Sequence, residues 1–579
     1  MIARRSVQFS SSKFVALLVA LSVTSPWIAG ASPPRSISKQ LTVSGRWLSA
    51  AAMPGALALN SGNARASAIS CAAVGNCTAV GSFGDGAGHD SAFVESQSNS
   101  HWNSAVKLNG DATFLANSSV ANDVSCPVVS TCSVVGYETD SSGLTQGFVA
   151  SEVAGVWHPA QSIPGLDALN SANHARATVI SCGSGGNCAA GGYFLDASLH
   201  YRAFVVNQIN GVWKSAIAVP GILSLSNAGN AQVTALSCRA RSSCSAGGYI
   251  NGGSNHQQPF VVTELNGSWG LPVVVVNDAS FNAGGKAQIT ALSCTSVGNC
   301  TAGGFYRDKS TNQQPFLMSQ VGGNWNAPFD VPGVAALNAA NASVTAVSCD
   351  AAGGCAVGGF FTGAFGRQQP FLISESAATW SPLTVVSNAS NVANNTRAQI
   401  TAVACDPTGF CGAGGFFTAP GNHVEAFVLG RTNSQWGSSS VLPGSDVLNV
   451  GNAALVTALS CPAVGYCAAV GNYQDGSSNA QNFVAVRATS PSAPLQIAAV
   501  SSKGSAHVSW KAPTSNGGAT ITQYVVTSSP LHRTCTSVSV RSCTVKGLLA
   551  QHAYSFSVVA VNPVGASVKS AASRVVTVR

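Results

Sequence analysis

The chain of 579 residues is poor in charge, since Lys, Arg, Asp and Glu together make up only 8% of it. It is equally poor in long apolar runs, because its Ala and Val are dispersed among 60 Gly and many Ser and Asn. Residues 14–23 form the one continuous apolar run, and no segment has a helical period long enough to predict a helix. These absences exclude a bundle of membrane-spanning helices and a mainly helical fold.

Sequence signatures of catalysis are also missing. The chain has no GxSxG nucleophile elbow and no SxDxGxTW box of the sialidase type, and its 20 acidic residues lie mostly in variable turns. Glycoside hydrolysis needs two carboxylates about 5 to 10 Å apart, and no cluster of Asp or Glu interrupts the pattern described below. We therefore expect no enzymatic activity and no cofactor. The chain also lacks RGD, which gives no support to integrin-type adhesion.

What the sequence does contain is one unit repeated eight times, exemplified by AQITALSCTSVGNCTAGGFYRDKSTNQQPFLMSQVGGNWNAPFDVP at residues 287–332. Alternating, β-branched runs separated by Gly, Asn and Pro predict four short strands in each unit. Each unit carries a Cys-x5-Cys pair, and the first cysteines recur at steps of 55 or 56 residues. The pairs are Cys71 and Cys77, Cys126 and Cys132, Cys182 and Cys188, Cys238 and Cys244, Cys294 and Cys300, Cys349 and Cys355, Cys405 and Cys411, and Cys461 and Cys467.

A Trp recurs on the fourth predicted strand, but its series begins one step early. Trp47 precedes every cysteine pair, whereas the eighth unit ends near residue 487 without a Trp strand. A ring removes both defects if residues 40–56 pair with the strands of residues 452–487. The sequence therefore predicts an all-β fold, an eight-bladed β-propeller over residues 36–488 with its last blade completed by residues 40–56. A linear solenoid is the alternative.

The repeat resembles the SCxxxxxC, VGxY and Trp-strand repeats of secreted bacterial proteins, many from actinobacteria. That resemblance covers residues 40–487. The resemblance implies a propeller fold, and it indicates no catalytic residues at the matching positions of this chain.

We expect the cysteines to form disulfides. Eighteen cysteines divide into nine close pairs, the ninth being Cys535 and Cys543, and an oxidising compartment preserves such pairs. Metal binding is the alternative, but a metal site needs a second pair of ligands that no unit supplies.

Residues 1–31 have a basic start, a short apolar core and a small-x-small site, which predicts a cleaved signal peptide. An uncleaved membrane anchor is the alternative.

Several positions within the repeat are candidates for function. His89, His200, His256 and His423 each lie four residues before the repeated Phe, in the variable loop between the second and third strands. Neighbouring blades are about 10 Å apart, so a shared metal ion is not expected, and contacts to sugar or protein are the functional alternative. Asp123 is the sole acidic residue in a predicted first strand. It is either a functional carboxylate of the channel or, as we expect, a solvated side chain.

Two polar series have structural explanations. The recurring LNxxN segments, such as Leu169-Asn170 to Asn173, are expected to form turns, with a ring of ligand-binding Asn as the alternative. A weakly polar residue stands four positions before each first cysteine, which suits either a wet central channel or hydrogen bonds within the blade. These residues are Ser67, Asn122, Thr178, Thr234, Thr290, Thr345, Thr401 and Thr457.

Residues 491–579 differ in composition and resemble a bacterial fibronectin type III module, with Trp510, Tyr524, Leu548 and Tyr554 at positions of that family's core. The resemblance implies a seven-strand β-sandwich, in which Cys535 and Cys543 would close one hairpin. This segment holds eight Lys or Arg and no Asp or Glu, whereas residues 36–490 have a net charge of −4 from 16 basic and 20 acidic residues. The terminal module is therefore the basic part of the chain.

Together these features predict a monomeric, secreted or cell-envelope protein that binds or displays without catalysis. The expected partners are an extracellular glycan, an anionic envelope polymer or a protein. Nucleic acid is not expected, and neither is a transmembrane helix after cleavage of the signal. The alternative is a polysaccharide-active enzyme, a glycoside hydrolase or lyase, with the terminal module as spacer.

Overall fold

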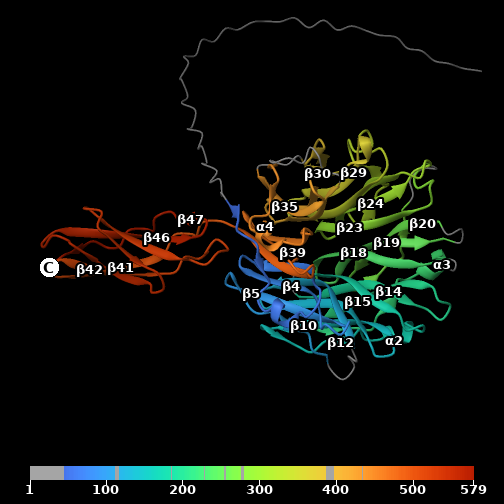
Figure 1. The fold of residues 1–579 in the computed structure, drawn as a ribbon, viewed down its shortest axis with the longest axis horizontal. Helices are drawn as coiled ribbons and strands as arrows, with labels where there is room; N and C mark the ends of the chain where they lie inside the picture. The colour runs from blue at the N-terminus through green and yellow to red at the C-terminus, as the bar shows by residue number, and fades with distance from the viewer. Residues whose placement is uncertain are drawn as a thin grey trace, which may run out of the picture. The chain divides into compact units, whose positions relative to one another are not determined.

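The computed structural model describes residues 45–110, 117–183, 186–226, 229–252, 256–275, 280–386, 397–432 and 434–579. The predicted signal peptide at residues 1–31 lies outside the described residues. Eight sheets of similar topology follow one another from Arg46 to Ala488, running from blue to orange in Figure 1, and a two-sheet sandwich follows.

Each of the eight sheets is built from one repeat by consecutive antiparallel strands. The first strands are β3 (Ala64–Ala73), β8 (Ser118–Val128), β13 (Ala175–Cys182), β18 (Ala231–Ala240), β23 (Ala287–Ser296), β28 (Ala342–Cys349), β33 (Ala398–Cys405) and β38 (Leu455–Ala463). The second strands are β4 (Asn76–Gly84), β9 (Thr131–Thr139), β14 (Cys188–Leu195), β19 (Ser243–Asn251), β24 (Asn299–Arg307), β29 (Cys355–Thr362), β34 (Cys411–Ala419) and β39 (Tyr466–Gln474). The third strands are β5 (Asp90–Ser98), β10 (Thr145–Val153), β15 (Tyr201–Ile209), β20 (Gln257–Leu265), β25 (Gln313–Val321), β30 (Gln368–Ser376), β35 (His423–Thr432) and β40 (Ala480–Ala488).

The fourth strand differs from the prediction, because it is divided into two short strands that both pair with the third. In repeat five, Asn324–Trp325 and Phe329–Asp330 flank Pro328, which has no N–H to donate to the ladder. The pairs in repeats one to seven are β6 (His101–Trp102) and β7 (Val106–Lys107), β11 (Val156–Trp157) and β12 (Gln161–Ser162), β16 (Val212–Trp213) and β17 (Ile217–Ala218), β21 (Ser268–Trp269) and β22 (Val273–Val274), β26 (Asn324–Trp325) and β27 (Phe329–Asp330), β31 (Thr379–Trp380) and β32 (Thr384–Val385), and β36 (Gln435–Trp436) and β37 (Ser440–Val441).

The eighth sheet takes its outer strands from the beginning of the described chain. Strand β1 (Arg46–Trp47) pairs antiparallel with β40, so that Trp47 lies opposite Arg487. Strand β2 (Ala51–Ala52) pairs with the same strand around Phe483. Two segments about 440 residues apart in sequence therefore share one hydrogen-bonded sheet.

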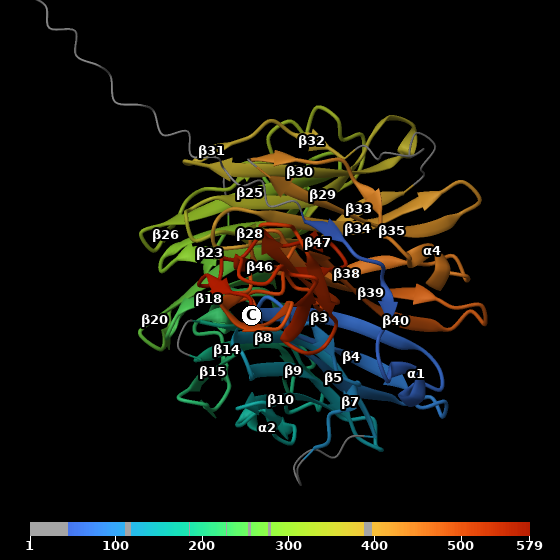
Figure 2. The same cartoon turned by 90° about the vertical axis from the view of Figure 1, so that its left-hand side faces the viewer.

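The first strands are the inner strands of the repeats. Each contacts the first strand of the next repeat, from β3 through β8 and onward to β38, and β38 in turn contacts β3. Figure 2 shows these strands gathered inside the set of sheets, with third strands such as β10, β15, β20 and β35 toward the outside.

A β-bulge interrupts the pairing of the first and second strands in all eight sheets. The extra residue is the recurring polar one, such as Thr178 between Ala177 and Val179. The opposite strand carries Gly at this point, because a Cβ on Gly192 would lie 2.0 Å from the backbone oxygen of Arg176. The bulge turns the Thr side chain out of the ladder.

This re-aimed hydroxyl links neighbouring sheets. Thr178 Oγ1 donates to the backbone oxygen of Val233 in the next repeat at 2.9 Å. Thr178 Oγ1 also lies 3.3 Å from the backbone oxygen of Gly191 in its own sheet. The expected hydrogen bonds within the repeat are therefore confirmed, and the bond to the next sheet is an addition that the sequence did not predict. The other donors are Thr234, Thr290, Thr345 and Thr401, at 2.5 to 2.7 Å, and Asn122 through its amide at 2.8 Å.

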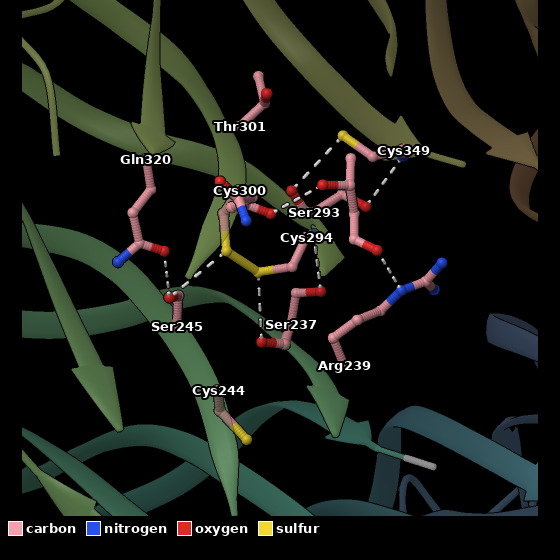
Figure 3. The surroundings of a disulfide bond; sticks show 12 residues. Ser237, Arg239, Cys244, Ser245, Ser293, Cys294, Cys300, Thr301, Gln320 and Cys349 are labelled. Carbon is pink, nitrogen blue, oxygen red and sulfur yellow. Dashed lines mark hydrogen bonds between the residues drawn. A yellow bond between two sulfur atoms is a disulfide. The ribbon is translucent and has the colours of Figure 1, made fainter. Parts of the chain in front are cut away.

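A second inter-sheet hydrogen bond is made at the first cysteine of seven repeats. The residue before the first cysteine is Ser in seven repeats, and its Oγ accepts the backbone N–H of the first cysteine in the next repeat. Figure 3 shows Ser237 with Cys294 and Ser293 with Cys349, at 3.1 and 3.0 Å. Ser460 accepts from Cys71 in the same way, at 3.0 Å, and so links the eighth sheet to the first. Repeat seven has Ala404 at this position.

The eight predicted disulfides of the repeats are confirmed. Each joins the first strand to the second of one sheet, with Cα atoms 3.8 to 4.1 Å apart. The repeated Phe of every third strand is buried, at 0 to 3% exposed. Outer Trp side chains add another inter-sheet link where a partner is present, as when Trp269 Nε1 donates to Asn207 of the preceding repeat at 2.9 Å.

The LNxxN segments form corners, as predicted. Asn170 donates its amide to the backbone oxygen of Thr145 and accepts the N–H of His174, which ties the corner to the third strand. Short helices that the sequence did not predict precede some of these corners, and Gly165, for example, enters one with a φ of 72°. They are α1 (Ala56–Leu59), α2 (Leu166–Leu169), α3 (Ile222–Ser226) and α4 (Ser445–Leu448), with a 3₁₀ turn η1 (Ala364–Gly366) in repeat six.

The C-terminal sandwich consists of two antiparallel sheets. One contains β41 (Leu495–Ser502), β42 (Ser505–Lys511) and β45 (Ser542–Lys546), and the other contains β43 (Gln523–Ser529), β44 (Thr534–Ser537), β46 (Ala553–Asn562), β47 (Gly565–Ala566) and β48 (Val576–Thr577). Trp510, Tyr524, Leu548 and Tyr554 are buried in its core, as predicted.

The ninth disulfide is present, but it does not close a hairpin as expected. Cys535 lies on β44 and Cys543 on β45, and these consecutive strands belong to different sheets. The Cα atoms are 6.1 Å apart, farther than the pairs that face each other within a repeat sheet. The bond therefore joins the two sheets of the sandwich.

The Ser–Cys hydrogen bond gives a direct test of how neighbouring sheets are held. Ser237→Ala leaves the N–H of Cys294 without its acceptor, and we expect a loss of about 1 to 2 kcal/mol in the free energy of unfolding, measured with denaturant. Ala404→Ser is the matched reverse change and should stabilise by up to about 1 kcal/mol. Unchanged unfolding of Ser237→Ala would show that this hydrogen bond contributes nothing to inter-sheet stability.

Candidate functional site

The four loop histidines are not brought together. His89 Nδ1 lies 3.0 Å from Asp85 and His200 Nδ1 lies 3.9 Å from Asp196, both within the same turn of their own repeats. The ring of His256 packs beside Gly285, and His423 is exposed next to Gly421. Over the described ranges, no group of three or more His, Cys, Asp or Glu is arranged to hold a metal ion.

The expectation that Asp123 is solvated is wrong. Its two carboxylate oxygens accept the backbone N–H groups of Val124 and of Ile180 in the next repeat, each at 2.9 Å. Burial raises the pKa of Asp123 to about 7, against the lowering effect of these two hydrogen bonds. Asp123 thus adds an inter-sheet link, and both of its oxygens are engaged.

Acidic residues of the loops between second and third strands mostly build turns. Asp85, Asp140, Asp196, Asp308 and Asp475 each accept two backbone N–H groups, two and four residues farther along the chain. Such hydrogen bonds are typical of Asp in turns. These carboxylates are explained by local structure.

A cleft on repeats two to four is the strongest candidate site. It has a volume of about 580 Å³ and crosses three adjacent sheets. We call it the tyrosine cleft, after the four tyrosines that line it together with polar and cationic side chains. Its lining residues are Asn122, Tyr137, Arg176, Thr178, Tyr193, Tyr201, Gln232 and Tyr249.

Ring contacts fix the geometry of the cleft. Tyr193 and Tyr201 meet edge to face, with ring centroids 5.1 Å apart and planes at 81°. His174 packs beside both, at 6.1 and 5.9 Å. The guanidinium carbon of Arg176 lies 4.0 Å from the ring centroid of Tyr137 on the preceding repeat, which is a cation–π contact. Rings held in this way present stable apolar faces and half-buried hydroxyls.

The repeat register explains why the cleft forms on these three sheets. The residue after the close-approach Gly of the second strand is aromatic in repeats two to seven, and it is Tyr only in repeats two, three and four. The series is Tyr137, Tyr193, Tyr249, Phe305, Phe360 and Phe416. Sequence reasoning missed this site, although the change from GGY to GGF along the repeats was a usable signal.

The cleft carries a single permanent charge. None of its lining residues is Asp or Glu, and Arg176 is the only Lys or Arg among them. Burial raises the pKa values of the Tyr193 and Tyr249 phenols, which therefore stay protonated near neutral pH. Burial and the nearby Arg176 charge lower the pKa of His174, which favours the neutral imidazole. The cleft can bind through stacking, hydrogen bonds and one positive charge.

The sandwich has a different electrostatic character. All eight of its Lys and Arg side chains are exposed, and its sequence contains no Asp or Glu. They are Lys503, Lys511, Arg533, Arg541, Lys546, Lys569, Arg574 and Arg579. A surface of one sign attracts anionic polymers over several ångströms and loses that attraction in salt.

Comparison with known families identifies the sandwich. The described strands β41–β48 coincide with a match of residues 489–576 to the family described as "Fibronectin type III domain". Residues 489–576 form a fibronectin type III domain. No curated protein matches the chain. A fibronectin type III domain, together with nine disulfides, suggests an extracellular or binding role.

Solved structures give likenesses to both parts of the chain. The FN5 domain of Drosophila Lar is 27% identical over 15% of this chain and 96% of its own, with a TM-score of 0.13. Titin kinase with its flanking domains is 27% identical over 16% of this chain and 17% of its own, with a TM-score of 0.14. A protein of unknown function from Dyadobacter fermentans is 9% identical over 76% of this chain and 98% of its own, with a TM-score of 0.35. The match therefore spans less than a fifth of the titin chain's length.

In the part of the chain that the structure describes, no helix has the length and apolar character needed to cross a bilayer.

One buried carboxyl outside the cleft, that of Glu95, neither builds a turn nor links two sheets. Glu95 on β5 is 1% exposed, and neither of its carboxyl oxygens has a hydrogen-bond partner. The equivalent residue in each of the other repeats is apolar. These residues are Ala150, Val206, Val262, Met318, Ile373, Leu429 and Ala485. Burial raises the pKa of Glu95 to about 8, so the folded protein holds it protonated at neutral pH.

Glu95 predicts a pH dependence of stability. The folded state binds this proton up to a pH of about 8, whereas the ordinary pKa is 4.5, so the free energy of unfolding should fall as the pH rises between these values. The slope from this group is at most about 1.4 kcal/mol per pH unit. Glu95→Val should remove that slope and raise stability most at pH 8 to 9, measured by chemical unfolding as a function of pH. Equal slopes in the two proteins would contradict this account.

Proposed function

We propose that this chain is an exported, non-catalytic binding protein that recognises carbohydrate in the tyrosine cleft. The observation that carries the proposal is the lining of that cleft: four tyrosines, three uncharged polar side chains and one arginine, with no carboxylate. Aromatic faces suit the apolar C–H faces of sugar rings, and amides, hydroxyls and a guanidinium suit their polar edges. A glycoside hydrolase would instead need two carboxylates facing the bound sugar.

We further propose that the eight sheets are the blades of a closed β-propeller. The circuit of contacts from β3 to β38 and back supports this, as does the pairing of β1 with β40. In such a ring the repeats hold the three tyrosine-bearing sheets at fixed separations, which preorganises the cleft. The fibronectin type III domain would act as a basic module that attracts anionic envelope polymers, and the nine disulfides suit work outside the cell.

Binding of the full-length chain to a panel of soluble polysaccharides, measured by titration calorimetry, tests this proposal. We expect Tyr193→Ala and Tyr249→Ala each to weaken binding at least tenfold, since each removes a ring face and a hydroxyl from the cleft. Phe360→Ala is the matched control, because it truncates a ring at the same register in repeat six, outside the cleft. Thermal unfolding of each variant separates loss of binding from loss of fold.

Two outcomes would overturn the proposal. One is the absence of binding to every polysaccharide in the panel by a folded wild-type chain. The other is binding that the two Tyr variants leave unchanged.

A further inference from the structure

Arg176 is the one positively charged side chain among the residues that line the tyrosine cleft. None of the ion pairs among the described residues involves it, and its buried Nε has no hydrogen-bond partner. Arg202, two strands away on β15 of the same sheet, shows the contrasting case, with Nε 2.6 Å from Asp196. Arg307 and Arg431 also have a buried Nε without a hydrogen-bond partner, so Arg176 is distinguished by its place in the cleft.

The contacts of Arg176 restrict how its guanidinium can be used. Packing against the Tyr137 ring at 4.0 Å fixes the plane of the group but leaves its N–H donors in that plane available. Asn122 and Thr178 line the same cleft, and their side chains already donate to the backbone oxygens of Ala177 and Val233. The guanidinium of Arg176 is thus held in a fixed plane, and no acidic side chain among the lining residues compensates its charge.

Resting on the carbohydrate-binding function proposed above, we infer that the ligand of the tyrosine cleft is an acidic sugar whose carboxylate pairs with Arg176. A carboxylate is planar and matches the parallel N–H donors of a guanidinium in a two-bond contact. The neighbouring rings of Tyr193 and Tyr201 would hold the sugar ring. Tyr249 donates its hydroxyl to Gln232 Oε1 at 3.4 Å, and this polar pair in the lining would bind the sugar hydroxyl groups. The ligand class is a uronic acid oligomer or polymer.

The surroundings agree with an anionic ligand. Burial raises the pKa values of the Tyr193 and Tyr249 phenols and lowers the pKa of His174, which favours their neutral forms, so these groups neither compensate Arg176 nor compete for the carboxylate. The exposed basic residues of the fibronectin type III domain would attract the same polymer without selecting its sugar. The test must therefore separate selection in the cleft from general attraction.

Matched ligands make this separation possible. Oligomers of galacturonate, alginate and hyaluronan are each compared with their fully methyl-esterified forms, which keep the sugar backbone but lose the carboxylate charge. With the full-length chain at 0.15 M salt, we expect at least one acid to bind tenfold or more tightly than its ester. Arg176→Gln should reduce that preference to about twofold or less, and Arg176→Lys should restore it only in part.

Arg241→Gln is the matched control, because it changes the net charge of the chain by the same amount as Arg176→Gln. This change removes one positive charge from an exposed arginine outside the cleft, and the preference for the acid should survive it. Dextran sulfate serves as a competitor. If it displaces the oligomer equally from the wild type and from Arg176→Gln, the displaced oligomer was bound to the basic surface of the fibronectin type III domain and not in the cleft.

Failure of this inference and failure of the proposed function give different results. If acid and ester bind equally, or if Arg176→Gln keeps the preference, selection of a carboxylate is refuted. Carbohydrate binding in the cleft still stands in that case, provided that Tyr193→Ala weakens both ligands. If Tyr193→Ala weakens neither ligand, both proposals fail together.

Discussion

The hydrogen bonds between neighbouring sheets are the constraint on which the repeated structure depends. A sheet of five short strands cannot bury both faces alone, so each repeat needs its neighbours. The bulge residue of six repeats, such as Thr290, and the Ser before the first cysteine of seven repeats direct side chains to the backbone of the next sheet. Because these donors and acceptors recur at nearly constant sequence intervals, every sheet meets its neighbour in the same register. The apolar Phe and Ala layers then pack between sheets already aligned.

That fixed register is also what makes a binding site possible. Tyr137, Tyr193 and Tyr249 are far apart in sequence but occupy one position of three consecutive repeats, so the scaffold sets their side chains along one cleft. Loops can vary without disturbing this alignment, since their Asp residues form self-contained turns. The proposed site and the scaffold share some residues, since Asn122 and Thr178 line the cleft and also link neighbouring sheets. Asp123, a candidate functional carboxylate, belongs to the scaffold.

Much of this fold could be predicted from the sequence because its determinants recur. The cysteine spacing predicted the disulfides, and the composition and core aromatic residues predicted the fibronectin type III domain. The split fourth strand was missed because it occurs with Pro between the two short strands, as at Pro328, and also without it, as at residues 103–105, so no single residue type signals it. The tyrosine cleft was missed for a different reason. Attention to variable loops favoured the histidines. The candidate cleft instead depends on a strand position that is Tyr in three repeats, Phe in three, and Ser82 or Asn472 in the other two.

The pairing of β1 with β40 sets the order in which the molecule can be completed during synthesis. The strand at Arg46 emerges first, yet its partner at Ala488 emerges after all seven intervening sheets. Until then the early strand has an unpaired edge, and closing so long a loop is slow and entropically unfavourable. Final assembly must therefore await the last repeat, and a ribosome that stalls within the repeats would release a chain with two unprotected edges. Such a fragment would be a natural substrate for chaperones and proteases.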